Sequence, residues 1–329
     1  VYDTSKDSDG GAWRKRTQAT SWYQETLNTA TRGSRKEFPA VAVIVATTTT
    51  VTIYDGDDPA LPMWRVTNQI DGVVPQFWRE GRSATSLYAL NGKLVIGIVT
   101  DTPAGLAMID FAADLLFRWS SGGTSGGTLS GVSNDASATA TLSGVLPALV
   151  STAVNDVAMT VLPNAPIDAA TGLPVPTIAV ATAGGVSVIK DDGNVWDITY
   201  TSFNIMSHIA FRSDGSLQYI SDTANLGRYV HVDHELPTAD NAKGVVGYLG
   251  TADSEFYYSN TSNYAGRSLY LISGNVNVLG GNAIGNNAGL SVLEPNRVTP
   301  ANGMVAYTTS TYNTGWMNGN IKLATLSDT

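Results

Sequence analysis

Residues 178–198 read IAVATAGGVSVIKDDGNVWDI, and this stretch decides the fold. It holds three runs rich in Val, Ile and Ala, separated by a Gly-Gly pair and by Asp191-Asp192-Gly193. β-Branched residues favour extended backbone, and glycine supplies the positive φ angle that a tight turn between two strands needs. The stretch therefore predicts three strands that follow one another along the chain as a meander.

The same unit recurs along the chain in a degenerate form. Five apolar runs each follow another apolar run by one turn, and each ends on or near an acidic residue. Repeated antiparallel units are typical of a β-propeller, whose blades need roughly 40 to 50 residues. The intervals between the runs vary, which indicates blades with loop insertions. The acidic residues are Asp55, Asp110, Asp191, Asp233 and Glu294.

We therefore predict an all-β protein: a β-propeller of about five to seven irregular blades with an irregular N-terminal arm. The arm covers residues 1–38 and the propeller residues 39–299. Residues 300–329 supply closing strands or lead to a further C-terminal domain. Residues 120–144 are rich in Gly and Ser, and we expect an exposed insertion or a weak outer strand there.

One turn can be predicted in detail. Asn91-Gly92 lies between two apolar runs. In a type I′ turn both central residues need a positive φ angle, which Asn and Gly adopt most readily. The dipeptide therefore predicts a tight hairpin.

Composition and charge limit the classes of function. Hydrophobic residues make up 43% of the 329 residues and charged residues 14%, which indicates a folded core. The net charge of −9 disfavours general nucleic-acid binding, which needs a basic face. No apolar run approaches the length of a membrane-spanning helix, so we expect none. The sequence contains no cysteine, which excludes disulfides and thiolate metal sites.

The first 36 residues depart from the acidic average, with seven Lys or Arg against four acidic residues, a balance of +3. We expect their aromatic side chains to bury against the propeller or against another chain. The charge predicts a docking surface for an acidic partner or another subunit; the alternative is a solvated arm with local ion pairs. The candidate docking residues are Trp13, Arg14, Lys15, Arg16, Trp22, Tyr23, Arg32, Arg35 and Lys36.

No combination of residues predicts a catalytic or metal site. The stretch DGDD at 55–58 concentrates carboxylates but lacks the spacing of a Ca²⁺-binding EF-hand, so an exposed turn is the preferred interpretation. His231 and His234 flank Asp233 at a strand end, where strand alternation directs the two rings to opposite faces. We therefore expect no metal, no cofactor and no enzymatic activity.

One short motif bears on a hydrolase alternative. Asp191, Gly193 and Trp196 partly match the Asp box of sialidase propellers, although Ile189 stands where that motif has Ser or Thr. The motif is structural in those enzymes. A glycosidase needs an acid pair, or a tyrosine nucleophile with flanking arginines, brought together by the fold.

A wider resemblance rests on longer stretches: VYDT at 1–4, GAWRKR at 11–16, TSWY at 20–23, LNTATRGSRKEFP at 27–39, YDGDDP at 54–59, AVNDVAMT at 153–160 and YNTGWM at 312–317. Together they resemble a family of tailed-bacteriophage virion proteins. In that family, similar regions precede a concanavalin A-like, lectin-type domain. This chain ends before any such domain, so lectin-type carbohydrate binding is implied only for a longer parent protein.

The resemblance implies a structural tail or fibre component that resides in the virion and takes part in assembly and host-surface attachment. Its partners would be other virion proteins and copies of itself, in a homo-oligomer. Two alternatives stay open. One is an adhesion module that binds host-surface glycans through residues 256–264, and the other is a sialidase-like glycan depolymerase.

Overall fold

The computed structural model describes residues 1–47, 50–68, 83–99, 105–120, 127–132, 143–200, 205–223 and 227–243, and the backbone of later strands within 254–309. These ranges are mostly β-strand. The helical elements in them are two short 3-10 helices, η1 (Thr4–Lys6) and η2 (Ala12–Arg16). The described part thus confirms the all-β prediction, and none of its helices is long and apolar enough to cross a membrane.

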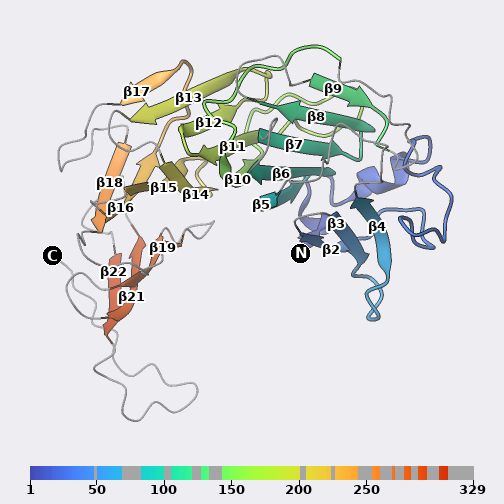
Figure 1. The fold of residues 1–329 in the computed structure, drawn as a ribbon, viewed down its shortest axis with the longest axis horizontal. Coiled ribbons are helices and arrows are strands. Elements are labelled where there is room, and N and C mark those ends of the chain that lie inside the picture. Colours follow the sequence, from blue (N-terminus) through green and yellow to red (C-terminus); the bar gives the residue numbers. More distant parts are fainter. Residues whose placement is uncertain are drawn as a thin grey trace, which may run out of the picture. The chain divides into compact units, whose positions relative to one another are not determined.

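The chain divides into two compact units. Unit 1 comprises Val1–Thr199 and Pro237–Ala242, and unit 2 comprises Tyr200–Leu236 and Lys243–Thr329. In the described ranges the strands form five sheets, numbered here in chain order, and neighbours in a sheet are mostly consecutive in the chain (Figure 1).

Sheets 1 to 3 contain the strands of the first 200 residues. Sheet 1 consists of β1 (Tyr2–Asp3), β2 (Val41–Ala46), β3 (Thr50–Asp55) and β4 (Met63–Asn68). Sheet 2 consists of β5 (Ser83–Leu90), β6 (Lys93–Val99), β7 (Gly105–Asp110), β8 (Leu115–Trp119) and β9 (Gly127–Ser130). Sheet 3 consists of β10 (Val154–Thr160), β11 (Thr177–Thr182), β12 (Gly185–Ile189), β13 (Val195–Tyr200) and β17 (Asn241–Lys243).

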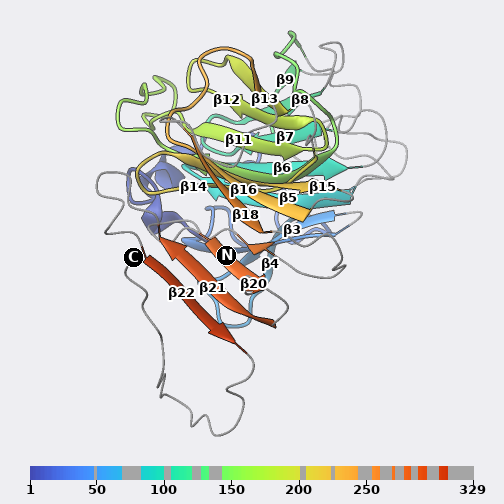
Figure 2. The same ribbon diagram turned by 90° about the vertical axis from the view of Figure 1, so that its left-hand side faces the viewer.

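Sheets 4 and 5 contain most of the later strands (Figure 2). Sheet 4 consists of β14 (Ile205–Phe211), β15 (Leu217–Thr223), β16 (Gly227–Asp233) and β18 (Ser254–Ser259). Sheet 5 consists of β19 (Leu269–Tyr270), β20 (Val278–Asn282), β21 (Ala288–Glu294) and β22 (Met304–Thr309).

The local turn chemistry behaves as the sequence indicates. Strands β11, β12 and β13 pair antiparallel in succession, with Ala181 opposite Val186 and Val188 opposite Trp196. Asn91 has a φ angle of 52° and Gly92 one of 72° in the loop between β5 and β6. The meander and the type I′ hairpin are therefore both confirmed.

The predicted insertion and C-terminal segment are described in part. Within 120–144, β9 pairs with β8 as an outer strand, and Thr128 forms a bridge with Ser143; residues 121–126 and 133–142 lie outside the described ranges. In the last segment, β22 pairs with β21 in sheet 5, and residues 310–329 lie outside the description.

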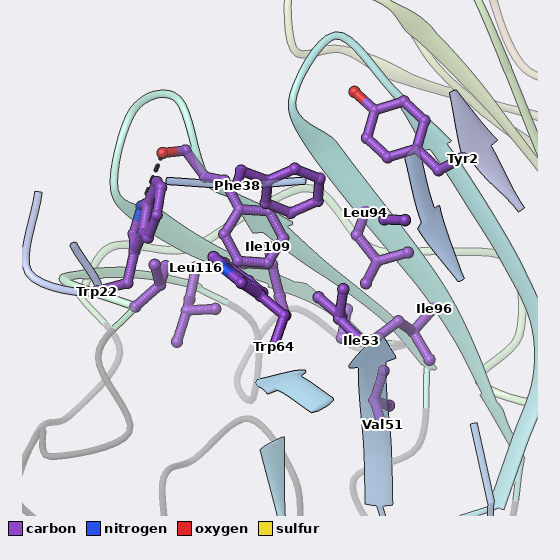
Figure 3. Packing of buried hydrophobic residues seen from close by; sticks show 14 of the residues in the cluster. Tyr2, Trp22, Phe38, Val51, Ile53, Trp64, Leu94, Ile96, Ile109 and Leu116 are labelled. Atoms are coloured by element: carbon purple, nitrogen blue, oxygen red, sulfur yellow. Dashed lines mark hydrogen bonds between the residues drawn. The ribbon is translucent and has the colours of Figure 1, made fainter. Parts of the chain in front are cut away.

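Two apolar cores hold unit 1 together, one on each face of sheet 2. Leu94, Ile96 and Ile109 pack in the first core with residues of sheet 1, including Val51 and Ile53 (Figure 3). The neighbouring positions of the same strands face the second core, which they share with β10, β11 and β12 of sheet 3: Val95, Leu106 and Met108. Because both faces of sheet 2 are covered, β6 and β7 are continuously apolar rather than alternating.

A glycine sets the spacing between sheets 2 and 3. Strand β10 lies against β5 and β6. A Cβ atom on Gly97 would lie 2.7 Å from Cγ1 of Val154 and 2.8 Å from Oγ1 of Thr85, closer than non-bonded atoms in contact can come. The sheets can approach this closely because position 97 carries no side chain.

The repeated acidic residue at the strand end has a structural role in three sheets. In each, the buried carboxylate forms an ion pair with a Lys or Arg from another segment. Two of these carboxylates also accept a backbone N–H from the turn that follows, Asp57 N–H in one case and Ala113 N–H in the other. The pairs are Asp55–Arg35, Asp110–Lys93 and Asp233–Lys243.

Replacement of the acid should therefore have very different effects at two repeats. Asp110→Ala leaves Lys93 buried without its carboxylate, and we expect it to lower the free energy of unfolding by about 3–5 kcal/mol. Asp191→Ala changes a half-buried residue of a surface turn and should cost no more than about 0.5 kcal/mol. Denaturant unfolding measures both values; similar values for the two variants would contradict this role of the repeated acid.

Candidate interface in the N-terminal segment

The N-terminal segment (residues 1–38) adds a strand to sheet 1 and then crosses to sheet 2. Tyr2 pairs with Ala42 across β1 and β2. The Asp3 carboxylate accepts the backbone N–H of Ser5 and so caps η1. Beyond η2 the backbone forms hydrogen-bonded turns, in one of which Gln24 N–H donates to Thr20 O at 3.3 Å. The segment is irregular, as predicted, yet each part of it is tied to the sheets.

The aromatic side chains of the segment are buried in its own chain. Trp13, Trp22 and Phe38 expose at most 1% of their surface. The Phe38 ring lies 4.9 Å from the Trp64 ring of β4 and 5.0 Å from the Phe111 ring after β7, and these rings meet edge-on or tilted (Figure 3). The sequence left two alternatives for these rings, burial against the chain's own sheets or against another chain. In the structure they bury against the chain's own sheets.

A buried carboxylate connects the segment to the Asn91-Gly92 turn. Asp7 accepts hydrogen bonds from the Tyr2 hydroxyl at 2.5 Å, from Trp13 Nε1 at 2.8 Å and from Asn91 N–H at 2.8 Å. Burial raises the pKa of Asp7, and the three hydrogen bonds oppose this effect. The Tyr2 hydroxyl in turn accepts Gly92 N–H at 2.9 Å. The hairpin turn of sheet 2 is thereby held by the first residues of the chain.

A second turn of sheet 2 is held in the same way. Trp22 Nε1 donates to Phe111 O at 2.9 Å. Ser21 donates from both its N–H and its hydroxyl to the Asp114 carboxylate, each at 2.8 Å. The N-terminal segment thus bridges sheets 1 and 2 at two points.

Arg32, one of the predicted docking residues, is a buried structural cation. It exposes 1% of its surface, and its guanidinium donates to Trp64 O and Lys36 O, each at 2.8 Å. It lies 4.3 Å above the Trp64 ring and forms an ion pair with buried Glu25. Burial lowers the pKa of Arg32 to about 10, so the side chain keeps its charge at neutral pH.

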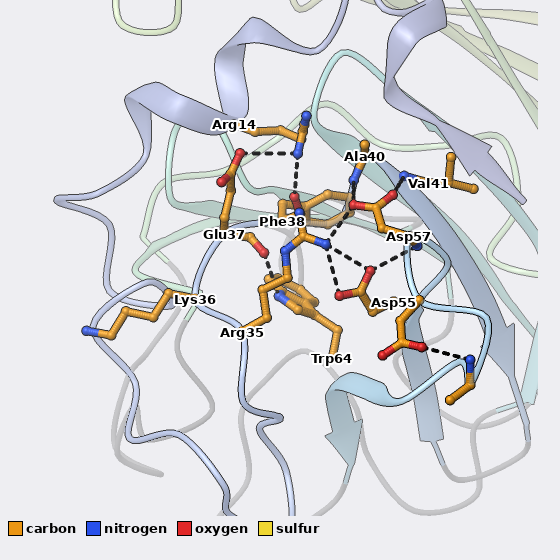
Figure 4. Close-up of polar contacts among 12 residues, drawn as sticks. Arg14, Arg35, Lys36, Glu37, Phe38, Ala40, Val41, Asp55, Asp57 and Trp64 are labelled. Atoms are coloured by element: carbon orange, nitrogen blue, oxygen red, sulfur yellow. Dashed lines mark hydrogen bonds and ion pairs between the residues drawn. The ribbon is translucent and has the colours of Figure 1, made fainter.

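Other predicted docking residues form ion pairs at the surface (Figure 4). Arg14 contacts the Glu37 carboxylate at 3.2 Å and donates to Phe38 O at 2.9 Å. Arg16 contacts Asp9 at 2.7 Å and donates to Thr171 O, in the loop between β10 and β11, at 3.0 Å. Much of the positive charge of the segment is therefore balanced within the chain.

Arg35 explains the acidic stretch at 55–58. Its Nη1 donates to both Asp55 oxygens at 2.9 Å and to Asp57 at 2.6 Å. Asp57 also accepts Ala40 N–H and Val41 N–H, each at 2.9 Å. The carboxylates organise a turn around a guanidinium. Among the described residues no cluster of three or more His, Cys, Asp or Glu could hold a metal ion.

Three of the predicted docking residues remain exposed: Lys15, Arg16 and Lys36. Lys15 forms no hydrogen bond or ion pair with any residue that the structure describes. The Lys36 ammonium lies 5.6 Å from the half-buried Tyr23 ring, a cation–π contact. A docking role stays a prediction; within this fold Trp13, Trp22 and Arg32 have almost no surface to offer a partner.

Unit 2 contains a buried polar cluster that sequence reasoning did not find. The Tyr200 and Tyr219 hydroxyls lie 2.7 Å apart, and Tyr219 donates to Asp233 at 2.9 Å. His231 stacks on the Tyr219 ring at 4.9 Å, and its Nε2 lies 2.8 Å from the Ser221 hydroxyl. Tyr219 and His231 are partners in the register of β15 and β16, and this pairing, rather than any local pattern, brings them together.

This cluster favours a neutral imidazole. Burial, and to a lesser extent the Lys243 ammonium, lowers the pKa of His231 to about 3. Burial also raises the pKa values of Tyr200 and Tyr219. His231 exposes 3% of its surface and Tyr219 none. The arrangement is that of a closed hydrogen-bonded network, which stabilises the sheet.

Comparison with known proteins does not assign a family. No family model matches the chain, and no curated protein matches it. A solved structure of a putative 6-phosphogluconolactonase from Bacteroides uniformis is similar over 83% of this chain and 69% of its own, at 13% identity and a TM-score of 0.35. The β-propeller domain of Cps50 (Swd1) from Myceliophteria thermophila is similar over 87% and 95%, at 11% identity and a TM-score of 0.33. At such scores neither similarity carries a conclusion.

Stability measurements can test the role of the N-terminal aromatics. Trp22→Ala removes a fully buried ring and its hydrogen bond to Phe111 O, and we expect it to lower the free energy of unfolding by about 3–5 kcal/mol. Lys15→Ala changes an exposed side chain and should shift that value by no more than about 0.5 kcal/mol. A Trp22→Ala variant as stable as the parent would show that the ring does not pack as described.

The His231 ring should not titrate near neutral pH. An unfolded histidine has a pKa near 6.5, and the pKa of His231 in the folded protein is lower. The contribution of His231 to the free energy of unfolding is therefore fully present above about pH 6.5. As the pH falls below that value, the free energy of unfolding should decrease by about 1.4 kcal/mol per pH unit from this group. NMR of the His231 ring protons checks this directly, since an inflection near pH 6.5 in the folded protein would contradict a buried neutral ring.

Proposed function

We propose that this protein is a structural component of a tailed-phage virion, a tail or fibre protein that takes part in assembly and host-surface attachment. We further propose that its sheets are the blades of a β-propeller. The proposal rests on the sequence resemblance described above, on the order of the sheets and, above all, on the folded N-terminal segment.

The sheet order supports the propeller. Each sheet contains strands that are largely consecutive in the chain, which is how propeller blades are built. In unit 1, sheet 2 shares one apolar core with sheet 1 and another with sheet 3. Because sheet 2 is covered on both faces, Val95 on one face is as completely buried as Ile96 on the other. A blade within a propeller ring is likewise covered on both faces by its neighbours.

The folded state of the N-terminal segment is the observation that carries the assembly role. The segment contains the longest stretch of resemblance to the virion family, and it packs on sheets 1 and 2 instead of forming a free tether. A rigid surface loses little conformational entropy when a partner binds. Of the candidate docking residues, Lys15, Arg16 and Lys36 are exposed, and their charge suits an acidic surface on another virion protein.

We propose that Lys15, Arg16 and Lys36 act together as a docking patch, whose attraction for a partner is strengthened by repetition. Three exposed cations on one chain provide modest, salt-dependent attraction. In a symmetric homo-oligomer every copy presents the same patch, and simultaneous contacts raise the overall avidity without new interactions. We therefore place the protein in a repeated structure of the particle.

Mass spectrometry of gradient-purified particles tests the virion assignment. We expect the protein in intact particles, together with major tail proteins, in an amount that exceeds trace contamination. Its absence from intact particles, with secretion as a soluble protein, would refute the assignment.

The docking patch has its own test. A Lys15→Glu/Lys36→Glu variant should retain the parental thermal stability, because neither side chain is buried, but should be incorporated into particles several-fold less. The Lys190→Glu variant makes one such Lys-to-Glu change, half the charge change of the double variant, in a turn of sheet 3 and serves as the control. Equal incorporation of all three proteins would exclude this patch as the docking surface.

A further inference from the structure

A pocket of about 380 Å³ lies between the 28–35 loop of the N-terminal segment and the start of β4. Its polar wall includes Asn28, Thr29, Ser34 and Arg35, and its apolar wall includes Pro62 and Met63. The pocket involves neither Lys15 nor Lys36, so it is separate from the proposed docking patch. It also differs from residues 256–264, where the sequence placed a glycan contact; of these, 256–259 lie in β18 and the rest lie outside the described ranges.

The loop that forms the pocket is held in place by its backbone. Gly33 N–H donates to Trp64 O at 2.9 Å, and Asn28 N–H donates to Gly33 O at 3.2 Å. A Cβ atom at Gly33 would lie only 2.1 Å from Met63 O, so glycine permits this close approach of loop and strand. The wall is therefore preformed, which lowers the entropic cost of binding a ligand.

Arg35 provides a fixed set of donors at this wall. Its Nη1 makes the hydrogen bonds to Asp55 and Asp57, whereas Nε and Nη2 make none with the residues that the structure describes. Arg35 lines the pocket, and about a third of its side chain is exposed. Ser34 and Asn28 are exposed residues that also line the pocket, and their hydroxyl and amide groups can both donate and accept.

The charge balance selects the kind of ligand. Two guanidiniums line the pocket, and both are paired with carboxylates: Arg35 with Asp55 and Asp57, and Arg32 with Glu25. The lining therefore offers no unpaired positive charge for an anion. Its remaining groups are donors and acceptors suited to neutral hydroxyls. Pro62 and Met63 offer an apolar surface that can cover the C–H face of a ring. A volume of this size lies within the range of small-molecule sites.

We propose that this pocket binds a neutral sugar residue. The Arg35 Nε and Nη2 groups donate to sugar hydroxyl oxygens, and Ser34 and Asn28 complete the hydrogen bonding. The inference does not depend on the virion assignment, since it concerns the isolated protein and free sugars. It gives the protein a binding activity at a place that sequence patterns did not indicate.

Saturation-transfer NMR on the full chain tests this binding. The probes are glucose, galactose, N-acetylglucosamine and lactose, with N-acetylneuraminic acid and glucuronic acid as anionic counterparts. We expect saturation transfer to at least one neutral sugar, with weak, millimolar affinity, and little to the anionic sugars. No transfer to any neutral sugar, or tighter binding of the acids, would overturn the proposal.

Variants locate the binding in the pocket. Ser34→Tyr places a large ring in the pocket from an exposed position and should abolish the transfer without loss of thermal stability. Arg35→Lys keeps the positive charge but removes both the Nε and the Nη2 donors, and should weaken the affinity more than about tenfold, the effect of roughly two hydrogen bonds. Thr26→Tyr, at an exposed site on the same segment outside the pocket, is the control. Binding by Ser34→Tyr equal to that of Thr26→Tyr would place the sugar elsewhere.

Discussion

The burial of Trp13, Trp22 and Phe38 against Trp64 and Phe111 is the interaction on which the rest of unit 1 depends. It places the N-terminal segment against sheet 1 and the turns of sheet 2, where Asp7 reaches the Asn91-Gly92 turn and Ser21 reaches Asp114. These hydrogen bonds are buried or partly buried, and they contribute to stability because the aromatic packing excludes water from them. The hydrophobic contact thus sets the position, and the polar contacts make that position specific.

The same packing changes the meaning of the positive charge in the segment. A count of charged residues suggests a basic arm, but the fold places Arg32 in the core and pairs Arg14, Arg16 and Arg35 with carboxylates. Among the candidate docking residues, Lys15, Lys36 and the ion-paired Arg16 remain exposed. Because few cations remain exposed, we expect a partner to be recognised by its shape and by local charge complementarity. A general attraction between a basic arm and an acidic partner is less favoured.

An ion pair recurs at the ends of the strands, and in sheet 1 it also fixes a residue of the pocket. A carboxylate that ends a strand pairs with a cation from another segment, and in sheets 1 and 2 it also caps the following turn. In sheet 1 the cation is Arg35, which Asp55 and Asp57 hold through Nη1, so that Nε and Nη2 make no hydrogen bond with the described residues. The groups that stabilise the turn therefore also prepare the donors that we propose for sugar binding.

The sequence by itself determined many of the strands and the turns between them, because alternation, β-branched residues and the Asn91-Gly92 pair act through local backbone preferences. It did not indicate β4, where Arg65 is buried and breaks the apolar pattern, or β10, whose Asn155 and Asp156 interrupt it. Tertiary structure alone decided that the N-terminal rings bury in their own chain, that Arg35 sits between two carboxylates, and that His231 meets Tyr219. Contacts such as that of Trp22 with Phe111 join residues 89 positions apart, and a local pattern carries no information about which distant surface a side chain will meet.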